Sequence, residues 1–185
     1  MNPLQAHLIA LLHELAHGPG SGEPSGSAAE YGTGAEYGTG AEYGTGAEYG
    51  TGAEYGHFSE PAAGLLPTLE RLNAAQASVQ APPTRPGLPA LTAHLAQLLT
   101  FAAGQLNGDV AFPDFAAPWR TGAVNEEEWT AVRADLTAGF AAMQTALTRR
   151  ELESEELNVA QTALTHAAYH AGAMRFQALN LLAGR

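Results

Sequence analysis

Hydrophobic residues recur at helical spacing in five stretches of the chain. Leucines three or four positions apart give each stretch one apolar face, which is the pattern of an amphipathic helix. The predicted helices cover Pro3–His17, Gly64–Ser78, Leu88–Leu106, a stretch from Asn125 through Leu147, and one from near Ser154 almost to the C-terminus. Runs of β-branched residues are scarce, so no strand is predicted.

The predicted helix ends carry signals of their own. Gly18–Pro19–Gly20 stops the first helix, and Asn107–Gly108 closes the third. Asn125 is the predicted N-cap of the fourth helix, because Glu128 follows it at the spacing of a capping box. Residues 109–123 contain prolines and aromatic residues, which indicates an ordered but irregular crossover between two helices.

This pattern predicts an all-α protein of a single domain. Helices of this length with apolar stripes are expected to pack as an antiparallel four-helix bundle, here over residues 61–185. Residues 1–20 would add an extra N-terminal helix. Residues 21–60 would form a flexible loop between that helix and the bundle.

A hexapeptide repeat fills the predicted loop. The sequence AEYGTG runs four times from Ala29, and a truncated fifth copy ends at Gly56. Glycines make ordering entropically costly, and one tyrosine per copy offers little apolar burial in return. We interpret the repeat as a recent tandem expansion of coding sequence in a tolerant loop. A tyrosine-bearing adhesive tract is the alternative.

Composition and charge narrow the range of partners. Eight basic residues stand against nineteen acidic ones, for a formal net charge of −11, and no basic patch is visible. Such a chain repels phosphate backbones, so no nucleic-acid partner is expected. No apolar run approaches the ~20 residues that span a membrane, and the N-terminal stretch lacks the basic leader of a signal peptide. With no cysteine, disulfides and thiolate ligands are excluded, and a cytoplasmic protein is expected.

Two histidines lie four residues apart in the predicted last helix. His166 and His170 would project from one face about 6 Å apart, and the neighbouring alanines leave room for an ion and its water. A third ligand must come from a facing helix, where His94 is the best candidate because it lies within the Leu91–Leu99 stripe. Three neutral imidazoles plus water describe an open, catalytic type of metal site. Packed or solvated histidines are the alternative.

The same residues resemble a known family. The string HAAYHAGAMR, from His166 to Arg175, resembles the closing-helix motif of the DinB/YfiT-like superfamily: His, three residues, His, any residue, Gly, then Arg or Gln. Ala93–Gly108 resembles its second helix and Gly64–Ser78 its first. Trp119–Gly122 and Glu128–Leu136 resemble its aromatic crossover and third helix. The likeness covers about residues 60 to 183 in the family's order.

The resemblance implies a four-helix bundle with a three-histidine site for a divalent metal ion, often in a homodimer. It also implies a thiol-dependent transferase or hydrolase acting on a small-molecule substrate. Because the chain has no cysteine, the thiol would be an external, low-molecular-weight one. Zn²⁺, Ni²⁺ and Mn²⁺ all stay open as the metal, since imidazole suits several ions.

Three neighbouring residues have open roles. Many relatives carry a histidine where Gln97 stands, so either His94 or Gln97 supplies the third ligand, and His94 is preferred for its distance to Gly108. Tyr169 lies between the two histidines in sequence but away from both around the helix, which favours packing over catalysis. Arg175 could bind a substrate carboxylate or pair with an acidic residue.

A second motif has the spacing of a zinc protease. His13-Glu14-Leu15-Ala16-His17 is an HExxH string, in which His13 and His17 would hold zinc and Glu14 would act as general base. Gly20 and Glu23 follow at spacings a third ligand could use. Such a protease also needs a sheet before the motif, for which the residues ahead of His13 are too few. We interpret the two histidines as the polar face of a surface helix.

Three function classes follow from these patterns. The first is a metal-dependent transferase or hydrolase, and the second is a non-catalytic metal-binding or small-molecule sensor bundle. The third is a stress-related structural protein whose repeat mediates association. Bound metal would separate the first two from the third, and only turnover separates the first from the second.

Overall fold

The computed structural model describes residues 1–19, 64–79, 85–109 and 111–184. Within them the chain forms helices without any strand, which confirms the all-α prediction for this part of the protein. The elements are α1 (Pro3–His17), α2 (Leu65–Glu70), α3 (Ala74–Ala77), α4 (Leu88–Leu106), the 3₁₀ helix η2 (Pro118–Arg120), α5 (Glu126–Thr148) and α6 (Ser154–Leu182). The AEYGTG repeat and the predicted loop over residues 21–60 lie outside the described residues.

The predicted second helix divides into two short ones. The Asn73 side chain accepts a hydrogen bond from the Gln76 backbone N–H, and the Gln76 side chain accepts one from the Asn73 N–H, so a capping box starts α3. Just before it, the indole Nε1 of the buried Trp129 donates to the Leu72 carbonyl at 2.9 Å. These two sets of bonds satisfy backbone groups at the break between α2 and α3.

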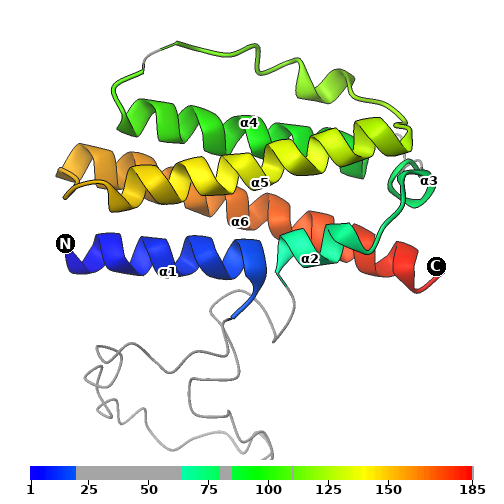
Figure 1. The fold of residues 1–185 in the computed structure, drawn as a ribbon, viewed down its shortest axis with the longest axis horizontal. Coiled ribbons are helices and arrows are strands. Elements are labelled where there is room, and N and C mark those ends of the chain that lie inside the picture. Colours follow the sequence, from blue (N-terminus) through cyan, green and yellow to red (C-terminus); the bar gives the residue numbers. More distant parts are fainter. Residues whose placement is uncertain (20–63, 80–84, 110, 185) are drawn as a thin grey trace, which may run out of the picture.

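Helix α1 belongs to the same core as the rest of the bundle. It lies end to end with α2 along one edge, and both pack on α5 and α6 (Figure 1). Leu8, Leu12 and Leu15 are buried in the common core. The expected extra helix is thus an integral part of the helical bundle: α1 and α2 lie end to end and share one core with α4, α5 and α6.

A buried glutamine joins α1 to the far end of α5. The Gln5 amide nitrogen donates to the carbonyls of Leu147 and Arg150, and its oxygen accepts from the Leu152 N–H. Gln5 is only 1% exposed, so its three hydrogen bonds satisfy polar groups that water does not reach. The N-terminus of α1 therefore lies at the turn between α5 and α6.

Helices α4 and α5 run in the same direction, which departs from the expected antiparallel arrangement. Their C-terminal ends lie together, since Arg150 donates to the Leu106 carbonyl. The chain between them returns along the length of α4 before α5 begins (Figure 1). A connection this long can span the bundle, so the two helices need not alternate in direction. Helix α6 is antiparallel to both, and Gln177 near its end donates to Pro86 just before α4.

Small residues let α6 approach its neighbours closely. Its buried face is mostly alanine: Ala160, Ala163, Ala167, Ala171 and Ala178. Short side chains on this face allow the backbones of neighbouring helices to come near that of α6. None of the described helices is long and apolar enough to cross a membrane.

Candidate metal centre

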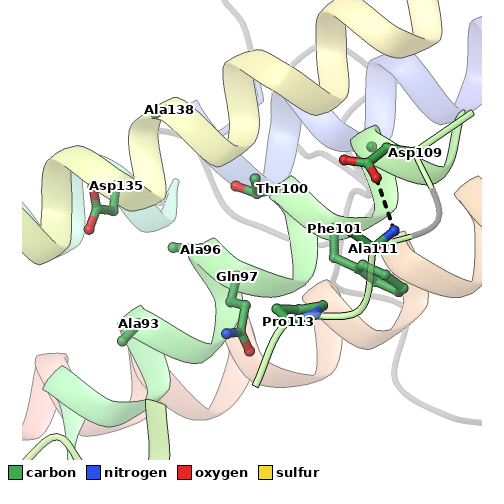
Figure 2. A pocket seen from close by; sticks show the side chains of 11 residues that line it. Ala93, Ala96, Gln97, Thr100, Phe101, Asp109, Ala111, Pro113, Asp135 and Ala138 are labelled. Carbon is green, nitrogen blue, oxygen red and sulfur yellow. Dashed lines mark hydrogen bonds between the residues drawn. The ribbon is translucent and has the colours of Figure 1, made fainter. Parts of the chain in front are cut away.

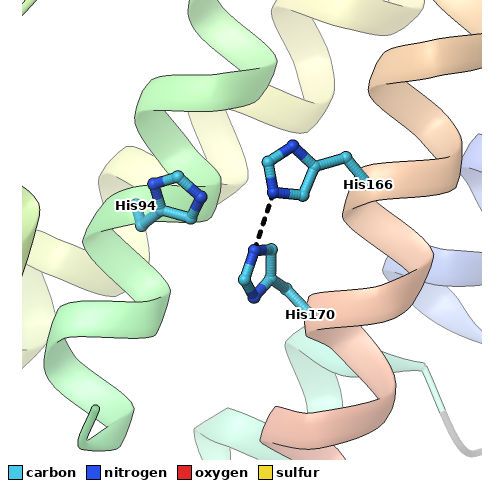
Figure 3. A group of neighbouring side chains, drawn as sticks. All are labelled: His94, His166 and His170. Atoms are coloured by element: carbon cyan, nitrogen blue, oxygen red, sulfur yellow. Dashed lines mark hydrogen bonds between the residues drawn. The ribbon is translucent and has the colours of Figure 1, made fainter. Parts of the chain in front are cut away.

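Three histidines from two helices converge at one margin of the α4–α6 contact. His94 projects from α4, and His166 and His170 project toward it from successive turns of α6 (Figure 3). One ring nitrogen from each lies within 4.8 Å of the others. Zinc–imidazole bonds of 2.0–2.1 Å put ligand nitrogens roughly 3.3 Å apart in a tetrahedral site, so modest side-chain rotations would bring all three to one ion.

His94 is buried without a hydrogen-bond partner. Its side chain is 7% exposed, and neither Nδ1 nor Nε2 has a partner among the described residues. Burial lowers the pKa of His94, and the neighbouring His166 lowers it further. A neutral imidazole with a free nitrogen is the form that coordinates a metal ion. The donor set therefore fits a divalent ion, because coordination would satisfy a buried group that otherwise carries a desolvation cost.

His166 and His170 contact each other directly. Their Nε2 atoms are 2.8 Å apart, which is hydrogen-bond distance between one protonated and one free ring nitrogen. Burial lowers the pKa of His170 to about 4, with further contributions from His166 and His94. The neighbouring imidazoles thus disfavour protonation of His170, which keeps this side chain in the neutral form that a metal ion needs.

Trp119 of the crossover covers the cluster. Its ring centroid lies 4.3 Å from that of His94 and 6.4 Å from that of His170. The 3₁₀ helix η2 presents this indole to α4, and the ring remains 45% exposed. The sequence indicated an aromatic crossover, but no local pattern showed that Trp119 would lie against the histidines. It shields one side of the site while leaving part of its own surface to solvent.

Gln97 is turned toward the crossover. Its side-chain nitrogen donates to the Asp114 carbonyl at 3.1 Å, and its buried oxygen has no partner in the described part of the chain. Gln97 and Pro113 line a cleft between α4, α5 and the crossover, whose volume is about 420 Å³. Figure 2 shows the side chains that line it. Of the two candidates for the third ligand, the structure therefore brings His94 to the histidine pair.

Tyr169 and Arg175 lie beside the site rather than in it. Tyr169 is 74% exposed, so the expectation that it packs is wrong, and its ring stands edge-on to His170 with centroids 5.2 Å apart. The Nε atom of Arg175 is buried and has no hydrogen-bond partner among the residues described. The predicted alternatives for Arg175, a substrate carboxylate or an acidic partner, both stay open.

The HExxH residues lie on the last turns of α1. His13 and His17 are exposed with ring centroids 5.0 Å apart, whereas Glu14 is buried. Within the described ranges, three potential metal ligands come together at His94, His166 and His170, and not around the HExxH residues. The described residues also contain no strand to bind a peptide substrate, while Gly20 and Glu23 lie outside them. The exposure of His13 and His17 agrees with the interpretation that they form the polar face of a surface helix.

Comparisons with protein-family models, with curated proteins and with solved structures found no match to this chain. What the structure itself defines is an all-helical protein with a three-histidine group that could hold a metal ion.

Proposed function

We propose that this protein binds one divalent transition-metal ion through His94, His166 and His170. The observation that carries the proposal is the buried imidazole of His94, whose two nitrogens lack partners in the described structure and which faces a histidine pair on α6. A buried polar group without a partner is costly, so its retention here needs a reason. Coordination of an ion supplies that reason.

The residues around the site have separate roles in this proposal. The three histidines hold the ion and leave further coordination positions for a small molecule. The bound ion would supply Lewis-acid chemistry at an oxygen or sulfur atom of that molecule. Trp119 covers the His94 side of the site and limits access of water there. Zn²⁺, Ni²⁺ and Mn²⁺ are the candidate ions.

We further propose that the reaction is the one implied by the resemblance to the DinB/YfiT-like superfamily. That reaction is a transfer or hydrolysis that uses a small external thiol, in a chain that would form a homodimer. Support comes from the motifs that supply His94, His166 and His170, because these residues converge in space as the resemblance implies. The chain has no cysteine, so its own side chains offer no thiol.

A non-catalytic metal-binding or sensor bundle is the second candidate. The observation favouring it is that the three-residue cluster in the described structure consists of histidines alone and includes no carboxylate that could act as a general base. The two candidates share the site and differ only in turnover. Assays of small thiols with electrophilic partners, with and without Zn²⁺, Ni²⁺ or Mn²⁺, separate them.

Metal content tests the site itself. The metal-free chain would be incubated with each ion, desalted and analysed for bound metal by mass spectrometry. We expect one ion per chain, loss of that ion in H166A and H170A, and unchanged helicity by circular dichroism. H13A is the matched control and should retain the ion. Loss of metal in H13A, or full retention in H166A and H170A, would place the ion elsewhere and refute the proposal.

Tryptophan fluorescence provides a second, independent measurement of metal binding at the three histidines. Trp119 lies against His94, whereas Trp129, the other tryptophan, is fully buried in the core. Binding of paramagnetic Co²⁺ or Ni²⁺ should therefore quench Trp119 emission preferentially. The Trp119→Phe variant should lose most of the quenching while still binding the ion.

A further inference from the structure

A groove leads from the histidine cluster along the contact between α4 and α6. It has a volume of about 240 Å³, and His166 forms one end of it. The α4 wall continues from His94 toward the C-terminus of that helix, and the α6 wall runs back from His166 toward its N-terminus. The main lining side chains are Leu98, Phe101, Ala102, Val159, Thr162 and Ala163. The groove therefore runs away from His170.

The lining of this groove is apolar and uncharged. Besides His166 itself, its polar side chains are the hydroxyl of Thr162 and, at the end far from the histidines, the amides of Gln105 and Asn158. No lining residue carries a carboxylate, ammonium or guanidinium group. A charged ligand segment would lose hydration here without gaining a partner, whereas an aliphatic segment would gain from burial.

The dimensions suit a small molecule. His166 lies eight positions after Asn158 on α6, which is a rise of about 12 Å at 1.5 Å per residue. The volume corresponds to about eight water-sized groups at ~30 Å³ each. Small side chains at Ala102 and Ala163 form part of the lining, while Phe101 and Leu98 add apolar surface. Such a space accepts a single flexible chain.

We propose that this groove holds the uncharged aliphatic tail of a small ligand whose head group binds at the histidine site. The inference rests on the proposed metal site, because the head group needs the ion held by His94, His166 and His170. Continuity between the groove and His166 sets the order: the head group lies at the histidines, and the tail extends toward Gln105 and Asn158. The ligand class is therefore a neutral aliphatic chain bearing a metal-binding group.

A homologous series of ligands tests this directly. The full-length chain loaded with Co²⁺ would be titrated with straight-chain alkyl hydroxamic acids from acetyl to octanoyl, and the cobalt absorption bands would report binding of the head group. Burial of one methylene is worth ~0.8 kcal/mol, so the dissociation constant should fall about fourfold per added methylene until the groove is filled. A dissociation constant that does not change with chain length overturns the inference.

Two variants test whether the dependence of affinity on chain length comes from this groove. T162W fills the groove with an indole and should abolish the chain-length dependence, while acetohydroxamic acid binds as it does to the unsubstituted chain. Q161W is the matched control, because Gln161 is exposed on α6 and does not line the groove. It should keep the full dependence. An undiminished dependence in T162W would place the tail elsewhere and overturn the inference.

The outcomes also separate this inference from the proposed function. If the chain takes up no Co²⁺, both proposals fail. If it binds Co²⁺ and acetohydroxamic acid but shows no gain with chain length, the metal site stands and the groove does not hold a tail. Equal helicity of all variants by circular dichroism confirms that each comparison is made on folded protein.

Discussion

Gly64 lies directly against the backbone of His17, so closely that a Cβ atom at position 64 would stand 2.1 Å from the His17 carbonyl carbon. The end of α1 and the start of α2 thus meet in space, although residues 18–63 separate His17 from Gly64 in the chain. The Gly64 backbone has φ −59°, which any residue can adopt, so the need for glycine there is purely steric. This close contact holds the end of α1 and the start of α2 together in the bundle.

We expect Gly64→Ala to destabilise the protein. The added methyl group would meet backbone atoms that cannot rotate away, and overpacking of this kind costs about 1–3 kcal/mol or more. Chemical denaturation followed by circular dichroism measures the effect. The matched control is Gly172→Ala on α6, where a Cβ meets nothing within 4 Å and alanine favours the helix by ~1 kcal/mol. If Gly64→Ala left the free energy of unfolding unchanged, α1 and α2 would not meet as described.

Replacing residues 21–62 by a short Gly-Ser linker should leave the bundle intact. Since His17 and Gly64 are already adjacent, a short connection can join them. Each halving of loop length reduces the closure cost by about 0.6 kcal/mol, so the free energy of unfolding should rise by roughly 1–2 kcal/mol. Thermal and urea denaturation measure this change. A shuffled segment of unchanged length is the control and should match the original chain, whereas a marked loss of stability in the shortened chain would show that the segment supports the fold.

His94→Leu should have opposite effects on metal binding and on metal-free stability. Leucine removes two buried nitrogens that have no partners in the described structure, so the metal-free protein should gain about 1 kcal/mol. The same change removes a proposed ligand and should abolish stabilisation by added Zn²⁺. Denaturation in EDTA and in excess Zn²⁺ measures both. His13→Leu is the control and should keep the Zn²⁺ effect; a metal-free His94→Leu protein that unfolds more easily would instead assign His94 a packing role.

The ion pair that begins α6 predicts a pH dependence of stability. Arg150 donates to the Glu156 carboxylate, which also accepts from the Glu153 N–H, and these bonds lower the pKa of Glu156 from 4.5 to about 2. Because the pKa in the folded state lies below the unfolded value, the stabilisation is complete above pH 4.5 and is lost as the pH falls toward 2. Glu156→Gln should therefore lower the melting temperature at pH 7, and its difference from the parent chain should shrink below pH 4.5.

Glu155→Gln supplies the comparison for that prediction. Glu155 occupies the same first turn of α6 and is exposed, and no described ion pair involves it. We expect it to change the melting temperature less than Glu156→Gln at pH 7. If the two variants behave alike from pH 7 to pH 2, the Arg150–Glu156 pair contributes nothing specific.

Local signals determined most helix boundaries from the sequence. The Pro3–His17 and Leu88–Leu106 helices have the predicted bounds, and the predicted capping box between Asn125 and Glu128 is present. These features depend on residues within a few positions of one another. The four-residue spacing of His166 and His170 is equally local, so their shared face followed from the sequence alone.

Contacts between residues far apart in the sequence determined the features of the fold and the site that local patterns did not predict. The break before α3 includes a bond from Trp129 to Leu72, which lies in another part of the chain. The parallel course of α4 and α5 depends on where the crossover leads, and no periodicity encodes that. The meeting of His94 with the α6 pair depends on the rotation and axial position of two packed helices. A sequence pattern specifies which face of a helix is apolar, but only packing specifies which side chains on two such faces come within reach of one ion.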